Sequence, residues 1–398
     1  MAYKLEFLTP AFLYGADQTK PEFRLASLTG QMRYWWRMTQ KWPSNNDLPA
    51  FKQKEGDIFG MPDDKNASAK SFYIYLTQKP DFIAEKAEQL KNRDGSIAKD
   101  RKSGQPLHRY VTRNKGTQYF FYPFMRHVGT FSWIPVNTCF EFDIDFVHDK
   151  HTDRILLSLF LLSRFGGLGS RSRRGAGSFS LAGDELFELT EMDLVRYVNS
   201  DDKKNVSGHR YFSCIDTRSP IWQALSNNAR FKMQKPVNDW ESALDYIGFQ
   251  MQKMRTNFKG QNRDVDPDFT DEAIGLHQYY DLDQTPPDPI TKDAFGLPRI
   301  INFSSSHPPV RNALTIAPYK KDAKGNEKET RRASPLHITI NRKNNRYYAT
   351  LLILWDGLDF LPSDVPIKIQ KKGNRNIRTY PTISNPPVDK LEQFLERL

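Results

Sequence analysis

Residues Arg164–Phe179 read RFGGLGSRSRRGAGSF and join two predicted elements of the chain. The apolar run 155–162 before them predicts a helix, and Ser178–Leu181 predicts a strand. Residues 154–183 contain five arginines and no acid. Glycine lacks a Cβ atom, so it adopts positive φ and lets another backbone come close, and guanidinium groups bind phosphate oxygens in pairs. We therefore predict that this stretch, the Gly/Arg loop, holds a phosphate backbone.

Other glycine motifs do not fit the Gly/Arg loop. A P-loop follows a strand, opens a helix and carries a lysine, whereas the order here is helix, loop, strand. A dinucleotide-binding fingerprint fails for the same reason. A glycine-rich turn without any ligand is the alternative interpretation. The candidate RNA-binding residues of the loop are Gly167, Gly169, Arg171, Arg173, Arg174, Gly175 and Gly177.

Composition favours a polyanionic partner. The chain has 398 residues and a formal net charge of +11 at pH 7, and its length predicts two domains. A basic surface without a specific ligand is the alternative. Two cysteines, Cys139 and Cys214, are too few for a disulfide framework or a cysteine zinc site and suit a reducing cytoplasm. The first residues lack the apolar core of a signal peptide and no apolar run would span a bilayer, so we expect a cytoplasmic protein with no membrane partner.

The N-terminal residues predict a second basic surface. Tyr3–Leu8 predicts a strand that Thr9-Pro10 ends, and a polar segment, 15–24, leads to a helix for which Ser27 is the expected N-cap. Tryptophans on one side of this helix are expected in the core, whereas arginines recur every four residues on another side. Because residues 25–46 contain no acid, phosphate contact explains this stripe better than a solvated face does. The candidate residues are Lys20, Arg24, Arg33 and Arg37.

A short internal repeat predicts two related halves. Residues 57–62, DIFGMP, recur as residues 293–298, DAFGLP, and each copy stands between a predicted helix and a predicted strand. The order strand, helix, strand, strand, helix, strand is that of the ferredoxin-like fold, whose open sheet face often binds single-stranded RNA. We predict an α+β protein of two tandem ferredoxin-like (RRM-like) domains with insertions, residues 1–185 and 186–398.

The remaining predicted elements follow from hydrophobic periodicity. Helices are expected at residues 152–164, 240–258 and 389–398, and strands at residues 71–76, 118–122, 138–146, 209–216, 335–340 and 347–355. Insertions are expected at residues 92–118, 260–289 and 320–332. The first insertion has seven Lys or Arg against two acids and predicts a basic hairpin or loop over the nucleic acid. Residues 368–378 add five basic residues and no acid.

Several of these motifs resemble those of one family. Thr9–Arg24, Ser27–Arg37 and Gly166–Gly177 are similar to the motifs of the RAMP superfamily of CRISPR–Cas proteins, and within it the chain resembles the first subunit of the Cmr (type III-B) effector. Residues 295–298 and 331–336 resemble the second half of that family. The central insertions show no match to it.

The resemblance implies a role in antiviral defence. It implies a hetero-oligomeric RNA-guided complex in which this subunit contacts other Cmr effector subunits and binds CRISPR guide RNA, target RNA or both, near the 3′ end of the guide. Cleavage of target RNA in that family belongs to the repeated backbone subunit, and cyclic oligoadenylate synthesis belongs to the large subunit.

The chain contains no complete catalytic motif. No His-Glu-x-x-His, Gly-Gly-Asp-Asp or Gly-x-Ser-x-Gly sequence occurs. The sequence therefore lacks the catalytic motifs of the corresponding proteases, polymerases and hydrolases. His108 and His127 are candidates for the acid or base of a metal-independent endoribonuclease that processes guide RNA. A purely architectural subunit whose basic loop docks an acidic protein is a third hypothesis. We favour a non-catalytic RNA-binding subunit with no cofactor and no metal.

Overall fold

The computed structural model describes residues 2–40, 47–62, 67–78, 82–215, 230–255, 299–301, 314–322, 325–331, 334–354, 365–371, 377–380 and 388–398. The chain divides into two compact units, residues 1–249 with 337–356 and residues 250–336 with 357–398. The first unit includes residues on both sides of the predicted boundary at residue 185, and that two-domain division stays a prediction. The second copy of the predicted repeat and the insertion 260–289 lie outside the described residues.

An antiparallel sheet in the order β11-β1-β10-β4 forms the base of the first unit. Its strands are β1 (Ala2–Phe7), β4 (Phe72–Gln78), β10 (Cys139–Phe146) and β11 (Phe179–Ala182). Leu5 pairs with Phe140 on one side and with Leu181 on the other, so the alternating apolar residues share one face of the sheet. The structure confirms the strands predicted at residues 3–8, 71–76, 138–146 and 178–181.

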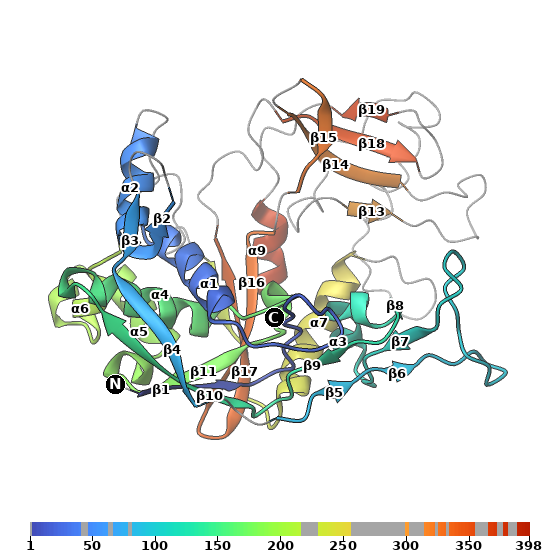
Figure 1. The fold of residues 1–398 in the computed structure, drawn as a ribbon, viewed down its shortest axis with the longest axis horizontal. Coiled ribbons are helices and arrows are strands. Elements are labelled where there is room, and N and C mark those ends of the chain that lie inside the picture. Colours follow the sequence, from blue (N-terminus) through green and yellow to red (C-terminus); the bar gives the residue numbers. More distant parts are fainter. Residues whose placement is uncertain are drawn as a thin grey trace. The chain divides into compact units, whose positions relative to one another are not determined.

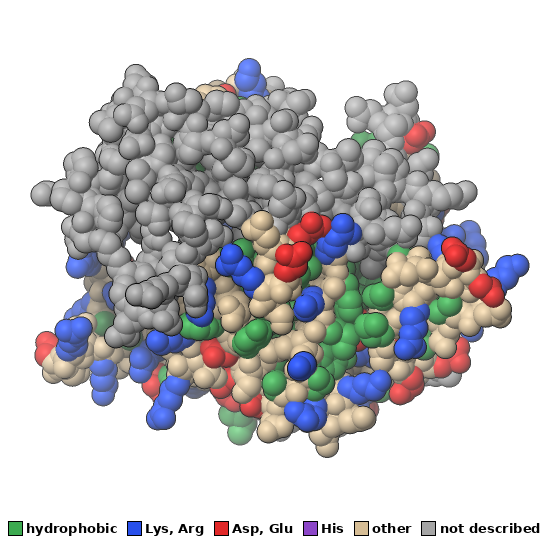
Figure 2. Space-filling view, turned by 180° about the vertical axis from the view of Figure 1, so that it is seen from behind, with side chains coloured by type: hydrophobic (Ala, Val, Ile, Leu, Met, Phe, Trp, Pro, Cys, Tyr) green, Lys and Arg blue, Asp and Glu red, His purple; other side chains and the backbone are tan. Residues whose placement is uncertain are grey.

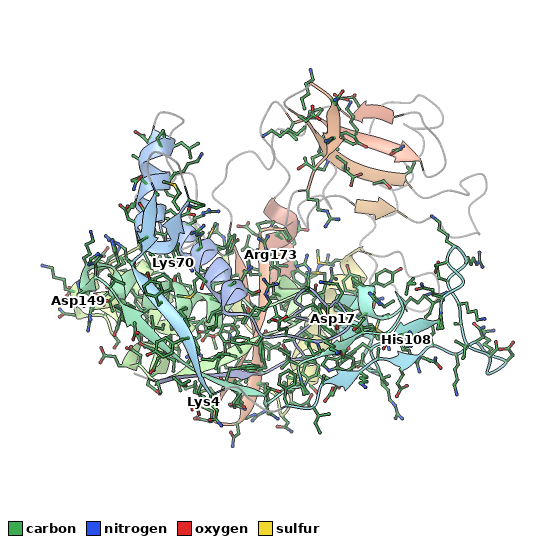
Figure 3. The ribbon with its side chains drawn as sticks, viewed as in Figure 1. Lys4, Asp17, Lys70, His108, Asp149 and Arg173 are labelled. Atoms are coloured by element: carbon green, nitrogen blue, oxygen red, sulfur yellow. The ribbon has the colours of Figure 1, made fainter. Side chains whose placement is uncertain are left out.

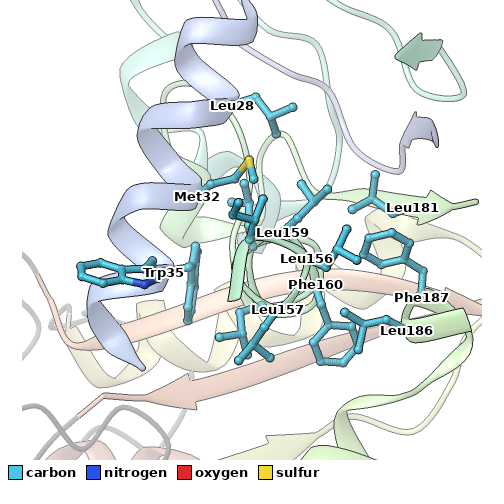
Figure 4. Packing of buried hydrophobic residues seen from close by; sticks show 14 of the residues in the cluster. Leu28, Met32, Trp35, Leu156, Leu157, Leu159, Phe160, Leu181, Leu186 and Phe187 are labelled. Carbon is cyan, nitrogen blue, oxygen red and sulfur yellow. The ribbon is translucent and has the colours of Figure 1, made fainter. Parts of the chain in front are cut away.

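Helices α1 (Leu25–Met38) and α4 (Thr152–Phe165) cover the apolar face of this sheet (Figure 1). Leu28, Met32 and Trp35 of α1 belong to one buried cluster with Leu156 and Leu159 of α4 (Figure 4). All five side chains are at most 3% exposed. The order β1-α1-β4-β10-α4-β11 is the one predicted for a ferredoxin-like domain, and α4 confirms the helix predicted at 152–164.

Helix α1 begins earlier than predicted. Ser27 is not its N-cap: Arg24 is, with extended backbone and no side-chain capping bond. The amide of Ser27 donates to the carbonyl of Arg24 over 2.9 Å, so Ser27 already belongs to the first turn. Leu25 is partly buried against the core, and this packing outweighs the missing cap. Trp35 and Trp36 are buried, as predicted.

A ribbon of short strands, residues 85–133 and here called the basic ribbon, is inserted between β4 and β10. Its elements are β5 (Glu85–Lys86), β6 (Glu88–Gln89), β7 (Leu107–Arg109), α3 (Lys115–Phe120), β8 (His127–Val128) and β9 (Ser132–Trp133). Bridges from Lys91 to Ile97 and from Lys99 to Pro106 fold residues 92–106 back on themselves. The insertion predicted at 92–118 therefore begins as a hairpin.

The strand predicted at residues 118–122 is wrong. These residues form the end of α3 and the start of a 3-10 turn, Tyr122–Phe124. Phe121 and Phe124 are buried and their rings lie 5.4 and 3.8 Å from that of Phe12. A short apolar run fits either a helix or a strand, and these long-range aromatic contacts decide between them.

A late hairpin completes the first unit. Strands β16 (Leu336–Lys343) and β17 (Arg346–Ile353) form a sheet with β12 (Arg230–Met233), in the order β12-β17-β16. The central place of β17 agrees with its apolar sequence. The amide of Ile340 donates to the hydroxyl of Ser178 over 3.0 Å, and the hydroxyl of Thr339 donates to the carbonyl of Gly166 over 3.1 Å. The hairpin therefore fastens both ends of the Gly/Arg loop.

The strand predicted at residues 209–216 is also wrong, because residues 209–212 form helix α6 (His209–Phe212). Phe212 of α6 packs 5.7 Å from Phe160 of α4, ring centre to ring centre. Cys214, expected in this strand, follows the helix. The other elements that begin in this unit are α2 (Leu48–Phe59), β2 (Gly60–Met61), β3 (Ser68–Lys70), α5 (Glu191–Asn199) and α7 (Trp240–Arg255).

The second unit contains another antiparallel sheet, in the order β13-β14-β18-β19 with β15 beside β14. Its elements are β13 (Arg299–Ile301), β14 (Leu314–Lys321), β15 (Glu327–Glu329), β18 (Ile367–Lys371), β19 (Ile377–Tyr380) and α9 (Val388–Glu396). The closing helix confirms the prediction for 389–398. Among the described residues no helix is long and apolar enough to cross a bilayer.

Candidate nucleic-acid interface

The end of strand β1 anchors the Gly/Arg loop. The hydroxyl of Thr9 donates to the carbonyl of Gly175 over 2.7 Å and accepts from the amide of Ser178 over 2.9 Å. The amide of Gly177 donates to the carbonyl of Pro10 over 2.9 Å. Thr9 is fully buried, so these bonds are shielded from water. The two most distinctive sequence motifs, Thr9-Pro10 and the Gly/Arg loop, are therefore parts of one structure.

The glycines of the loop approach the backbone of the protein itself. A Cβ atom on Gly177, where φ is +63°, would lie 1.9 Å from the carbonyl oxygen of Leu168. On Gly169, where φ is +91°, it would lie 2.5 Å from that of Phe12, and on Gly167 it would lie 2.9 Å from the oxygen of Ala176. These positions therefore exclude side chains for reasons of packing. Approach of an RNA backbone to Gly167, Gly169, Gly175 and Gly177 stays a prediction.

The three loop arginines lie in different environments. Arg171, with φ +64°, donates from Nε to the carbonyl of Phe120 over 2.6 Å and is half-buried. Arg173 places its guanidinium carbon 5.2 Å from the ring centre of Tyr34 and is also half-buried (Figure 3). Arg174 is only 9% exposed. Arg171 and Arg173 therefore remain accessible to a phosphate, and Arg174 fits a role inside the protein better.

A buried histidine lies beneath Arg173. Nε2 of His337 on β16 lies 3.2 Å from the hydroxyl of Tyr34, and the two rings stack with their centres 5.9 Å apart. Burial and the neighbouring guanidinium groups of Arg173 and Arg174 hold the pKa of His337 well below its usual value. The ring is therefore neutral at physiological pH. Sequence analysis missed both Tyr34 and His337, because only the tertiary fold brings β16 to α1.

The predicted basic stripe of α1 binds helix α2. Nε and Nη2 of Arg37 donate to the two carboxylate oxygens of Glu55, each over 2.6 Å. Nη2 of Arg33 donates to the carbonyls of Phe59 and Gly60 over 2.9 and 2.8 Å. Glu55 is buried, at 8% exposure. The stripe carried no acid within its own helix, but the fold supplies one from the next helix, so a structural role accounts for these two arginines.

Lys20 and Arg24 are exposed, as predicted. The side chain of Lys20 is 82% exposed and lies 4.0 Å from Asp17. Arg24 stands at the N-terminus of α1, where a cation is not favoured by the helix dipole and an anionic ligand would be. The hydroxyl of Ser132 donates to the carbonyl of Thr19 over 2.6 Å and holds this segment to the basic ribbon.

The basic ribbon exposes many cations. Its exposed Lys and Arg residues between 91 and 126 are Lys91, Arg93, Lys99, Arg101, Lys102, Arg109, Arg113, Lys115 and Arg126. Its two acids in this range are used in turns: Asp94 accepts from Ser96, and Asp100 accepts from Ser103. These hydrogen bonds lower the pKa of both carboxyl groups. Figure 2 shows Lys and Arg side chains scattered over the coloured part of the face seen from behind, with Asp and Glu side chains among them.

The two candidate catalytic histidines are cross-strand neighbours. His108 of β7 pairs with His127 of β8 in antiparallel register, which places both side chains on one face of the ribbon. Nδ1 of His127 lies 3.3 Å from the carbonyl oxygen of Gly129. The described residues hold no group of three or more His, Cys, Asp or Glu side chains that would bind a metal ion.

The N-terminal part of the chain is similar to a known class of protein. Residues 4–180, which run from β1 into β11 and contain the Gly/Arg loop, match the RAMP superfamily.

The relatives that the chain matches are subunits of CRISPR Cmr systems. The chain is similar to the CRISPR system Cmr subunit Cmr1-2 of Pyrococcus furiosus, with 27% identity over 190 residues, 45% of this chain and 93% of the relative. It is also similar to Cmr1-1 of the same organism, with 23% identity over 203 residues, 50% of this chain and 53% of that relative.

One solved structure supports the fold, and a second is similar at a lower score. The apo crystal structure of Cmr1 from Pyrococcus furiosus matches with a TM-score of 0.51 and 15% identity, over 100% of this chain and 95% of that one. A chain in the cryo-EM structure of the type III-B Cmr-beta bound to cognate target RNA and AMPPnP, in the presence of ssDNA, matches with a TM-score of 0.45 and 13% identity, over 100% and 98%. The mixed α and β architecture with several antiparallel sheets is that of Cmr1.

Proposed function

We propose that this chain is a non-catalytic RNA-binding subunit of a type III-B CRISPR RNA-guided complex. The similarity to Cmr1-2, which covers 93% of that relative, supports membership of such a complex. The observation that carries RNA binding is the Gly/Arg loop, which the protein's own backbone holds in one shape while Arg171 and Arg173 stay partly exposed. Guide RNA, target RNA or both, near the 3′ end of the guide, are the proposed ligands, and other Cmr subunits are the proposed protein partners.

The loop is preorganised for a phosphate. Its shape is set by buried bonds to Thr9 and Pro10 and by the hairpin β16–β17, so binding costs little ordering entropy. The ring of Tyr34 supports the guanidinium of Arg173 from one side, and Arg173 is only half-buried. His337 below is neutral and adds no further repulsion to the two arginines. Lys20 and Arg24 are additional exposed cations in the segment after β1.

Salt dependence tests the RNA site. Each phosphate contact with single-stranded RNA lowers the logarithm of affinity by about 0.7 per decade of salt. We expect R171Q/R173Q to weaken binding of a guide-length single-stranded RNA and to reduce this slope by about 1.4. Fluorescence anisotropy at 50 to 300 mM salt measures both. Arg174 is left intact because it is buried.

The control for this experiment is Arg196→Gln, since Arg196 is a 71% exposed arginine on α5 outside the loop. Thermal unfolding of each variant shows whether the loop keeps its fold, because Arg171 also bonds to Phe120. Unchanged affinity and slope in a folded R171Q/R173Q variant would refute the assignment of the loop as the RNA site.

The pairing of His108 with His127 favours one other function, a metal-independent endoribonuclease. One imidazole would take the proton of a ribose 2′-hydroxyl and the other would protonate the leaving oxygen. We expect no cleavage of repeat RNA by the purified chain in EDTA. Cleavage that is lost in both His108→Ala and His127→Ala would replace the non-catalytic proposal with this one.

A purely architectural role is separated from RNA binding by crosslinking. Ultraviolet crosslinks between RNA and residues 164–179 in the assembled complex would support the proposal. Crosslinks from this loop to protein alone would support a loop that docks an acidic partner.

A further inference from the structure

One tyrosine of the basic ribbon projects into solvent. Tyr122 opens the 3-10 turn that follows α3, and it is 72% exposed. Its side chain makes no ring contact, cation–π contact or hydrogen bond with any residue that the structure describes. Its two aromatic neighbours in the turn, Phe121 and Phe124, are buried instead. The ring of Tyr122 is therefore accessible to a ligand.

The turn that carries Tyr122 is fixed to the rest of the first unit. The rings of Phe121 and Phe124 both pack on the ring of Phe12. The amide of Tyr110, which follows β7, donates to the carbonyl of Phe124 over 2.7 Å. A ligand of Tyr122 therefore meets a turn that is already ordered, and this lowers the entropic cost of binding.

The same turn adjoins the Gly/Arg loop. Nε of Arg171 donates to the carbonyl of Phe120, the last residue of α3, over 2.6 Å. The amide of Ser170 donates to the carbonyl of Phe12 over 2.9 Å, so the loop and the turn share Phe12 as a support. Tyr122 follows Phe120 by two residues, which places their Cα atoms at most about 7.6 Å apart. An RNA strand held at Arg171 therefore reaches Tyr122 within a few nucleotides.

Exposed cations lie on the other side of Tyr122 in the chain. Arg126 follows it by four residues, stands directly before β8 and is exposed. Arg109 ends the neighbouring strand β7, is also exposed and lies opposite Glu88 of β6. At this end of the ribbon strands two arginines thus accompany one acid, and the local charge favours a phosphate.

The acids that α7 brings to α3 lie at the N-terminal end of that helix. Oδ1 of Asp245 accepts from the amide of Gly116 over 2.6 Å, and Glu241 accepts from the side-chain amide of Asn114 over 3.2 Å. Figure 1 shows α3 beside α7. Tyr122 follows the C-terminal end of α3, so these carboxylates bond to the end of the helix that is farther from Tyr122.

RNA suits this arrangement better than an acidic protein does. A single exposed aromatic residue is common on protein surfaces, but Tyr122 lies in the chain between Phe120, which binds Arg171, and the exposed Arg126. An unpaired base stacks on such a ring while its phosphates contact neighbouring cations. Carboxylates of a protein partner would pair with the arginines but be repelled by the negative face of the ring.

We propose that Tyr122 stacks an unpaired base of the RNA held by the Gly/Arg loop, and that Arg126 contacts a phosphate on the far side of that base. This inference rests on the proposed function, because it takes the loop to bind RNA. It extends the site from residues 164–179 onto the basic ribbon. It also predicts that the bound strand is single-stranded at Tyr122, since a base within a duplex offers no free face.

The test separates stacking from charge in the full chain. Fluorescence anisotropy compares a guide-length single-stranded RNA with a ribose-phosphate strand of the same length that lacks bases. We expect Tyr122→Ala to raise the Kd for the RNA about 5- to 150-fold, with its salt slope and its affinity for the base-free strand unchanged. Arg126→Gln should instead weaken binding of both strands and reduce the slope by about 0.7.

Two matched variants accompany Tyr122→Ala. Tyr122→Phe keeps the ring and should bind RNA as the wild type does. Tyr73→Ala removes a 55% exposed tyrosine from β4, the sheet edge opposite β11, and should leave RNA affinity unchanged. Thermal unfolding of each variant identifies any loss that comes from misfolding.

Three outcomes would overturn the proposal. Wild-type RNA affinity of a folded Tyr122→Ala variant would remove the stacking site while the loop assignment stands, provided that R171Q/R173Q still loses RNA. An equal loss for the base-free strand would show that Tyr122 does not act through a base. Crosslinks from residue 122 to protein alone in the assembled complex would assign this turn to a protein partner. A wild-type chain that binds neither strand would refute the proposed function, and the stacking site with it.

Discussion

Substitution of Gly177 by alanine tests whether the loop glycines serve packing or ligand approach. Gly177 has φ +63°, and an added Cβ would lie 1.9 Å from the backbone oxygen of Leu168. The left-handed conformation costs an alanine about 1 kcal/mol, and a displaced, hydrogen-bonded backbone costs about 1 to 3 kcal/mol more. We therefore expect the free energy of unfolding to fall by about 3 kcal/mol.

The assay is thermal unfolding of the RNA-free protein. For a folding unit of roughly 250 residues, each kcal/mol changes Tm by about 2 to 4 °C, so the Gly177→Ala variant should unfold about 6 to 12 °C earlier. The matched control is Gly30→Ala. Gly30 lies within α1 and has no atom within 4 Å of the position of an added Cβ, so alanine there should stabilise the protein by about 0.5 to 1 kcal/mol.

One outcome would refute this reasoning. If Gly177→Ala leaves Tm within 1 °C or about 0.5 kcal/mol of the wild type and abolishes RNA binding, the glycine serves approach of the ligand. The backbone around Leu168 would then yield to an added Cβ atom, and the close approach of Gly177 to Leu168 would not explain why glycine is needed there. A large loss of Tm in the absence of RNA supports the structural role, whatever happens to affinity.

Two further predictions concern the groups around the loop and α1. Glu55→Gln leaves Arg37 without its carboxylate partner, so we expect the free energy of unfolding in urea to fall by about 1 to 2 kcal/mol. The control Arg196→Gln removes an exposed ion pair and should lower it by less than about 0.5 kcal/mol. Equal effects of the two substitutions would contradict the structural role of Arg33 and Arg37. The pKa of His337 is well below its usual value in the folded protein, so the unfolded chain binds a proton at a higher pH than the folded chain does. The free energy of unfolding therefore falls as pH drops below about 6.5, by up to about 1.4 kcal/mol per pH unit. His337→Phe should lack this loss when Tm is compared at pH 7.5 and 5.5, and identical pH profiles would show that the ring is not buried and neutral.

Local patterns in the sequence predicted the first sheet and the helices that cover it. The alternation in Phe140, Phe142 and Ile144 needs only the geometry of a strand with one buried face. The long apolar run of α4 and the apolar residues of β17 are similarly local signals. Where the local signal was ambiguous, at residues 118–122 and 209–216, long-range aromatic packing selected helices.

The sequence by itself also singled out Thr9-Pro10 and the Gly/Arg loop, because glycine spacing and charge are visible without a fold. Only the tertiary structure decided what those residues touch. Thr9 meets Gly175, Arg37 meets Glu55, and Tyr34 meets His337, a residue 303 positions away. Such contacts depend on how distant elements pack, which no local pattern encodes.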